Sequence, residues 1–105
     1  MKTNLNDVSY LYYGTDQTTA LNIKINKKIK PTHDNVTLTK NLFYAKFYAD
    51  SKSDGLVLRT ELKDDFISLN NDDEYTTKKP ISINNFEILT FGHYWMPLEN
   101  WSPIY

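Results

Sequence analysis

Apolar and polar residues alternate with a period of two along much of this chain, and this alternation limits its fold more than any other feature. Alternation puts one set of side chains on a buried face and the other in water, as in a β-strand. The clearest stretch is residues 20–30, where Leu21, Ile23 and Ile25 share one side. The pattern predicts strands over residues 8–13, 20–30, 36–39, 42–49, 56–62 and 80–91.

The chain has 105 residues, enough for one domain with one hydrophobic core. Five to seven short strands predict a mainly β fold, or an α+β fold with one short helix. The expected architecture is a small antiparallel sheet, a barrel or a sandwich. We expect a single domain over residues 1–105. The tail, residues 92–105, carries both tryptophans and is expected to pack across the sheet or to lie at an interface.

Residues 42–49 are rich in aromatic side chains and fit two structures. A strand would place Phe43 and Phe47 on one face together with two alanines. A helix would stack the same two rings one turn apart. We favour the strand, because residues 50–55 have the composition of a loop and residues 56–62 alternate again. Together these segments predict a β-hairpin.

The best helix candidate is residues 60–69. Leu62, Phe66 and Leu69 recur at helical spacing, and Thr60 can cap the first turn. In the alternative interpretation, one strand ends near Leu62 and another begins at Phe66.

Two further positions interrupt the strand pattern. Residues 14–16, with the sequence Gly-Thr-Asp, predict a turn after the first strand. In residues 80–91 the apolar side changes at Asn84 and Asn85, which predicts a bulge or a break into two strands.

Composition excludes several classes of function. The chain has no cysteine, so disulfides, thiol chemistry and cysteine-ligated metal sites are ruled out. A net charge of −1 gives no global attraction to nucleic acid or anionic lipid. No signal-peptide pattern and no apolar run of membrane length occurs. We therefore expect a cytoplasmic protein that contacts no membrane and binds no metal or cofactor.

One stretch matches the spacing of a calcium-binding EF-hand loop. Asp50, Asp54, Gly55 and Glu61 fall at its first, fifth, sixth and last positions. Lys52, however, places an ammonium group where an oxygen ligand belongs. We therefore expect a hairpin turn, in which Gly55 supplies an unusual φ.

Catalytic motifs are missing from the sequence. None of the common hydrolase, zinc-protease or nucleotide-binding motifs occurs, and the two histidines, His33 and His93, are isolated. Asp64 and Asp65 are adjacent, so their side chains point in different directions. We therefore expect no enzymatic activity, since an active site would require a histidine to meet a carboxylate in a pocket.

Aromatic residues make up 14% of the chain, with 8 Tyr, 5 Phe and 2 Trp. Rings give a large contact area at low entropic cost, and they are enriched at interface hot spots. Without catalytic motifs, this richness favours a protein-binding function. The predicted partner-binding residues are Tyr44, Tyr48, Trp95 and Trp101. The tail rings have an alternative role in completing a small core.

The composition also suggests a source. Lysine far outnumbers arginine, and asparagine and isoleucine are frequent, which is typical of AT-rich genomes. The style is similar to that of small accessory proteins of phages, conjugative elements and chromosomal cassettes, although no residue motif carries the similarity. We predict a non-enzymatic accessory or inhibitor protein of a phage or mobile genetic element. Its partner would be a protein encoded by the host or by the element.

An alternative function is the binding of single-stranded nucleic acid by a small barrel that accompanies a replication enzyme. Aromatic rings that stack on bases, beside lysines that meet phosphates, are how such barrels bind. The residues predicted to act in this way are Lys24, Lys27, Lys28, Tyr44, Lys46 and Tyr48. A third feature, the acidic residues Asp64, Asp65 and 72–74, fits either a solvated loop or a contact with a basic partner.

Overall fold

A computed structural model describes residues 9–32, 36–69, 73–90 and 94–102. Two α-helices, nine short strands and two 3₁₀ turns lie in these residues. The elements are, in order, β1 (Tyr10–Asp16), α1 (Gln17–Asn26), β2 (Lys28–Ile29), β3 (Leu38–Thr39), α2 (Leu42–Asp50), β4 (Gly55–Glu61), β5 (Ile67–Ser68), β6 (Glu74–Thr76), β7 (Ile81–Ser82), η1 (Ile83–Asn85), β8 (Glu87–Leu89), β9 (Trp95–Pro97) and η2 (Leu98–Asn100).

Seven of the strands form one open antiparallel sheet in the order β5-β6-β3-β1-β4-β8-β9, and β2 pairs with β7 in a separate two-stranded sheet. The long central pair is β1 with β4, which runs from Tyr10 opposite Glu61 to Asp16 opposite Gly55. The fold is therefore α+β. Of the expected architectures, the antiparallel sheet is confirmed. The barrel alternative is wrong, because the sheet of the described residues is open and ends at β5 and β9.

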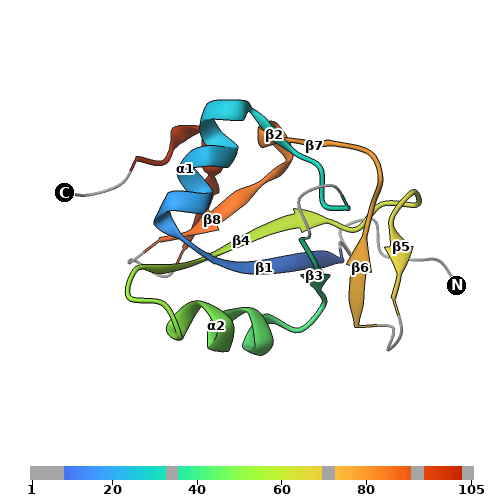
Figure 1. Cartoon of the computed structure of the whole chain (residues 1–105), viewed down its shortest axis with the longest axis horizontal. Helices are drawn as coiled ribbons and strands as arrows, with labels where there is room; N and C mark the ends of the chain where they lie inside the picture. Colours follow the sequence, from blue (N-terminus) through green and yellow to red (C-terminus); the bar gives the residue numbers. More distant parts are fainter. Residues whose placement is uncertain (1–8, 33–35, 70–72, 91–93, 103–105) are drawn as a thin grey trace, which may run out of the picture.

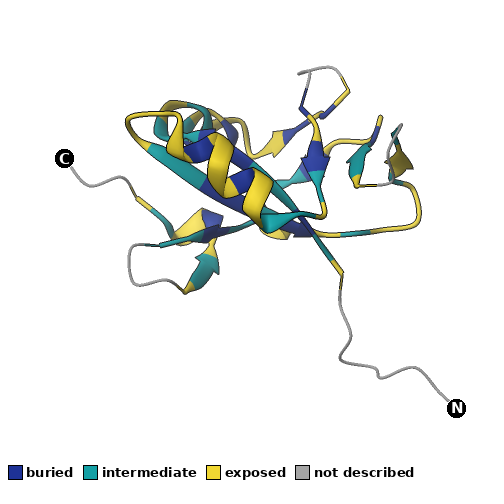
Figure 2. Ribbon diagram, turned by 90° about the horizontal axis from the view of Figure 1, so that it is seen from below, coloured by how far each residue is buried: buried dark blue, intermediate teal, exposed yellow. Residues whose placement is uncertain are grey.

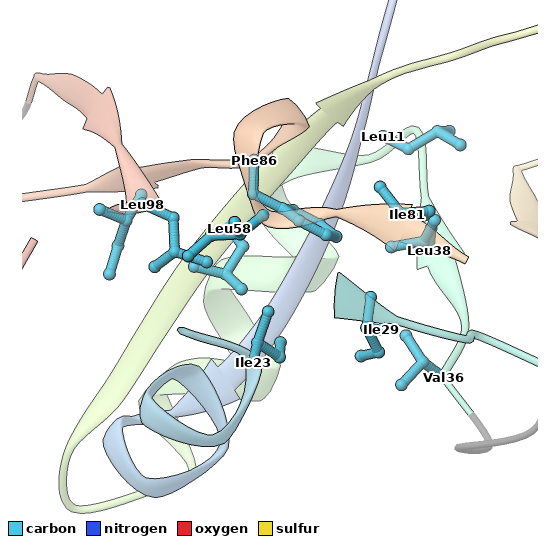
Figure 3. Packing of buried hydrophobic residues seen from close by; sticks show 11 residues of the cluster. Leu11, Ile23, Ile29, Val36, Leu38, Leu58, Ile81, Phe86 and Leu98 are labelled. Atoms are coloured by element: carbon cyan, nitrogen blue, oxygen red, sulfur yellow. The ribbon is translucent and has the colours of Figure 1, made fainter. Parts of the chain in front are cut away.

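The two helices cover opposite faces of the large sheet (Figure 1). Alternation along β1 and β4 sorts their side chains between these faces. Leu11 and Leu58 join the core on the side of α1, whereas Tyr12 and Val57 pack on the side of α2. The main core is therefore on the α1 side, where Phe86 and Ile23 also lie (Figure 3).

The strand predicted over residues 20–30 is wrong, because residues 17–26 form α1. Asp16 caps this helix, since its carboxylate accepts a hydrogen bond of 2.8 Å from the backbone N–H of Thr19. The helix ends at Lys27, which takes the left-handed conformation with φ 65°. Ile23 reaches the core, but Ile25 is 72% exposed, so the apparent alternation did not mark one buried face.

The strand predicted over residues 42–49, and with it the hairpin, is also wrong. Asn41 accepts hydrogen bonds from the backbone N–H groups of Phe43 and Tyr44 and so starts α2. The helix runs to Asp50 and is followed by a short turn into β4. The alternative that stacked Phe43 and Phe47 one turn apart on a helix is the one that agrees with the structure.

Both glycines at which the sequence predicts turns belong to strands. Gly14 belongs to β1 and Gly55 opens β4, so no turn occurs at residues 14–16 and no hairpin turn at Gly55. Among the described glycines none has positive φ. These positions require glycine because the backbone of α2 packs directly against them.

The remaining elements follow one of the alternatives left open by the sequence. The helix predicted over residues 60–69 is absent, because β4 continues to Glu61 and β5 forms at Ile67–Ser68. Residues 80–91 break into β7 and β8, as the change of side at Asn84 predicted, with the 3₁₀ turn η1 between them. The described part of the tail joins the sheet as the edge strand β9, and Leu98 is buried in the main core. No helix in the described part of the chain is long and apolar enough to cross a membrane.

Candidate protein-binding site

The helix α2 carries small side chains towards the sheet and large rings towards solvent. Ala45 and Ala49 are buried against β1 and β4. The outward residues form a surface that we name the α2 aromatic face. Its members are Phe43 (80% exposed), Tyr44 (61%), Phe47 (79%) and Tyr48 (53%). In Figure 2 the helix crosses the sheet with alternating buried and exposed bands.

Two glycines hold α2 very close to the sheet. A Cβ atom on Gly14 would lie 2.1 Å from the carbonyl oxygen of Ala45, and one on Gly55 would lie 1.8 Å from that of Ala49. Such distances are far below a van der Waals contact, so only glycine fits at these positions. Because the backbones approach this closely, no space is left beneath the helix for a ring. The rings of the α2 aromatic face are therefore confined to the solvent side.

The positions around the helix axis divide the outer surface into a crest and two flanks. At about 100° per residue, Phe43 and Phe47 form the crest opposite the buried alanines. Tyr44 and Tyr48 form one flank, where the ammonium group of Lys52 lies 5.2 Å from the centre of the Tyr48 ring. Lys46 and Asp50 are on the other flank, and both are exposed.

A second aromatic group lies on the sheet next to α2. Trp95 packs against the cluster of Ala45, Ala49 and Val57, with its ring centre 6.0 Å from that of Tyr12. The guanidinium group of Arg59 lies 4.2 Å from the Trp95 ring centre and 4.0 Å from that of Tyr10.

Arg59 is held in this position by an ion pair, because its Nε donates a 2.8 Å hydrogen bond to Glu87 Oε1. Arg59 is the single arginine of the chain. Its planar guanidinium suits both the stacking on rings and the hydrogen bond to a carboxylate. The half-buried strip of Tyr10, Tyr12, Arg59 and Trp95 thus extends the surface from α2 onto the sheet.

The four predicted partner-binding residues do not lie on one face. Tyr44 and Tyr48 are exposed on α2, and Trp95 is half-buried beside that helix. Trp101 packs against the main core on the opposite face, where the Lys24 ammonium group donates a hydrogen bond to its backbone carbonyl. A partner that contacts α2 therefore does not reach Trp101.

Sequence reasoning missed Phe43 and Phe47, the two most exposed rings among the described residues, as well as the strip around Arg59. Phe43 and Phe47 could have been found from their spacing of four residues, which is typical of a helix whose other side carries the alanines. The signal for the strip was weaker. It consisted of Tyr10 and Tyr12 two positions apart on one strand, together with a lone arginine.

The predicted nucleic-acid set is divided between the two faces of the sheet. Tyr44, Lys46 and Tyr48 are on α2, whereas Lys24, Lys27 and Lys28 belong to α1 and the residues that follow it. A single strand that contacted all six would have to pass around the edge of the sheet. The structure therefore leaves α2 with only half of the predicted residues.

The acidic residues are spread rather than gathered. Asp54 directly precedes β4 and Glu61 is its last residue, roughly 20 Å away along the strand, so the two cannot ligate one ion. Asp65 pairs with Lys79 at 3.7 Å, and Glu74 belongs to β6. In the described residues no group of three or more acidic or histidine side chains is placed to hold a metal.

A small pocket of about 250 Å³ opens beside Tyr10, Glu61, Lys63 and Glu87. Cavities that enclose a small-molecule substrate are commonly larger, from roughly 300 Å³ upwards, and are mostly apolar. His33 and His93, which an active site was expected to require, lie outside the described residues, as does Asp72 of the acidic segment.

Comparison with protein-family models, with curated proteins and with solved structures finds no match.

Proposed function

We propose that this chain is a non-enzymatic accessory or inhibitor protein of a phage or mobile genetic element, and that it acts by binding another protein. The binding surface is the α2 aromatic face, extended by Trp95 and Arg59 on the adjoining sheet. The observation that supports the proposal is the orientation of α2, with alanines packed on glycines below and four rings in water above.

The size of the exposed surface supports a binding role. At roughly 150–250 Å² per aromatic residue, the observed exposures leave about 400–700 Å² of aromatic surface in water. Contiguous apolar patches of that size are at the upper end for monomeric proteins and commonly mark interaction sites. A single exposed apolar residue, such as Ile25 on α1, is ordinary by comparison.

The shape of the surface indicates what the partner must offer. The nine residues of α2 form a ridge about 13 Å long, with Phe43 and Phe47 one turn apart along its crest. Helices that bind in this way place rings at such spacings into an apolar groove. The partner is therefore a protein with a short hydrophobic groove, and its rim would reach the half-buried Trp95.

The attribution to a mobile element rests on composition. Of twelve lysines and arginines only Arg59 is an arginine, and the chain is small and rich in asparagine and isoleucine. Small accessory proteins of this kind act on a partner from their own element or from the host. The genes that lie beside this one are therefore the first source of candidate partners.

The test uses the full chain immobilised beside two variants. Phe43→Gln/Phe47→Gln removes the crest but keeps good helix-forming residues, and Ile25→Gln removes an apolar side chain of similar exposure on the other face. A protein that the native chain captures from a lysate of its host is purified. Its affinity for the native chain and for each variant is then measured by calorimetry. We expect the crest variant to bind about 100-fold more weakly and the Ile25 variant to bind normally.

Two outcomes would contradict the proposal. In the first, both variants keep the affinity of the native chain for the captured protein. In the second, the chain retains no protein but binds single-stranded oligonucleotides with an affinity that falls steeply as salt rises, which would favour the nucleic-acid alternative.

A further inference from the structure

We infer that, in the absence of its partner, the α2 aromatic face is covered by a second copy of this chain in an antiparallel, two-fold symmetric dimer. The inference goes beyond the proposed function, because it concerns the isolated protein. Two features of α2 carry it, namely the charges beside the crest and the area that two copies would bury.

The charged flank of α2 is complementary to itself. Lys46 and Asp50 lie one turn apart on the same flank, and both are exposed. A two-fold axis that reverses the helix direction places this flank beside the same flank of the other copy. Lys46 of each copy then faces Asp50 of the other, whereas a parallel two-fold pair would place this flank beside the tyrosine flank of the other copy and leave both charges without a partner there. A symmetric interface needs this kind of self-complementarity.

Within one chain these two charges make no ion pair that the structure describes. The order of the residues explains why, since a lysine one turn before an acid pairs less well than an acid before a lysine. Asp50 also stands in the last turn of α2, where the helix dipole disfavours a negative charge. The ammonium group of Lys46 from a second copy would pair with the carboxylate of Asp50, for which α2 of the same chain provides no partner.

The other groups on the face are compatible with a copy of the same chain. The tyrosine flank of one copy lies beside the tyrosine flank of the other, and the two phenylalanine crests meet near the axis. Lys46 and Lys52 balance Asp50 and Asp54, so two copies carry no net charge towards each other. A strongly charged partner such as nucleic acid would find no excess of opposite charge here.

The buried area agrees with a weak dimer. Two copies that cover their rings and the charged flanks bury roughly 1,200 Å² in total, which is the lower limit of the range for specific interfaces. Such a dimer dissociates on dilution. Because it uses the same rings as the proposed partner site, self-association and partner binding exclude each other.

The test is sedimentation equilibrium of the purified full chain between about 1 μM and 1 mM, where weak dimers dissociate. We expect the native chain to shift from monomer to dimer across this range. Lys46→Glu leaves two acids on the flank and Asp50→Lys leaves two lysines, so each variant opposes like charges in its own dimer. Each should dimerise at least 10-fold more weakly than the native chain.

An equimolar mixture of the two variants should recover the dimer, because the acidic flank of one then faces the basic flank of the other. Lys28→Glu, with the same charge change on the opposite side of the sheet, should dimerise like the native chain. A native chain that stays monomeric throughout overturns the inference. The inference is also overturned if both flank variants dimerise as strongly as the native chain, or if their equimolar mixture does not form a dimer. None of these measurements requires the partner, so they stand apart from the test of the proposed function.

Discussion

The helices α1 and α2 have ten and nine residues and lie on opposite faces of one sheet, yet they are packed in opposite ways. The helix α1 sends Ile23 into a core that contains Phe86 and several leucines and isoleucines. The helix α2 meets the sheet through Ala45 and Ala49 and leaves its rings in water. One face of the sheet thus supplies most of the buried apolar surface, and the other presents a helix as a ridge.

Because of this difference, the two faces of the sheet are expected to have separate roles, one in the stability of the fold and the other in contact with a partner. Burial of apolar area is the main source of folding free energy, so the α1 face should dominate the stability of the domain. The α2 face contributes little burial, and its rings can therefore be changed without unfolding the chain. A division of this kind is expected where a surface is used for binding.

The largest effect on the free energy of unfolding is expected when one ring from each face is replaced in turn. Phe86→Ala should lower the free energy of unfolding by about 3–5 kcal/mol, because it leaves a cavity in the main core. Phe47→Ala removes a ring that is 79% exposed and should change stability by less than about 0.5 kcal/mol. Urea unfolding followed by circular dichroism measures both. Equal losses for the two variants would mean that the rings of α2 are buried in solution.

The next largest effect is expected at the close contact between α2 and β1. Gly14→Ala places a methyl group against the backbone of Ala45, which cannot move without lifting the helix. We expect a loss of about 1–3 kcal/mol, as for other overpacked sites. In an ordinary strand the same change would stabilise, since alanine loses less entropy than glycine on folding. An unfolding free energy that stays equal or rises would show that α2 does not sit on β1 as closely as described.

These two glycines also explain why sequence reasoning succeeded only in part. The antiparallel sheet followed from alternation, and the break in residues 80–91 followed from the change of side at Asn84. The helix α1 was missed, and for α2 the strand was preferred to the helix, because both local patterns fit a strand equally well. What decides α2 is its contact with Gly14, some thirty residues earlier, and with Gly55. A tertiary contact of this kind overrides a short alternating pattern.

The site was predictable to a similar degree. Aromatic richness predicted exposed rings, and exposed aromatics are found. Their grouping was not predicted, because the preferred strand would have put Tyr44 and Phe47 on opposite faces. Local signals for the helices did exist in Asp16 and Asn41, which are common N-cap residues and stand just before each helix.

These two caps should respond differently to acid. The hydrogen bonds from Thr19 hold the pKa of the Asp16 carboxyl below its ordinary value, so the charged cap stabilises α1. This contribution is complete above the unfolded-state pKa of about 3.9 and is lost as pH falls through the lower folded-state value. Asn41 caps α2 with a neutral amide, which does not titrate in this range.

The measurement is the unfolding free energy of the native chain, Asp16→Ala and Asp16→Asn at pH 7 and near pH 2. At pH 7 we expect Asp16→Ala to lose about 1 kcal/mol and Asp16→Asn to lose less, because asparagine also caps helices. Near pH 2 the native chain should lose its advantage over Asp16→Asn. Asn41→Asp is the matched control and should bring the same acid sensitivity into α2. An advantage of Asp16 that persists near pH 2 would contradict the role of its charge.

The smallest effect lies at the other ends of the two helices. Lys27 terminates α1 with φ 65°, a conformation that is unfavourable for a side chain with a Cβ atom, whereas Ser51 follows α2 with φ −74°. Lys27→Gly should therefore raise the unfolding free energy by about 0.5–1 kcal/mol, and Ser51→Gly should lower it by a similar amount. Thermal unfolding resolves changes of this size in a domain of this length. If both glycines destabilise, the left-handed end of α1 is wrong, and the hydrogen bond from Ile83 to the Lys27 carbonyl, which depends on it, should be lost as well.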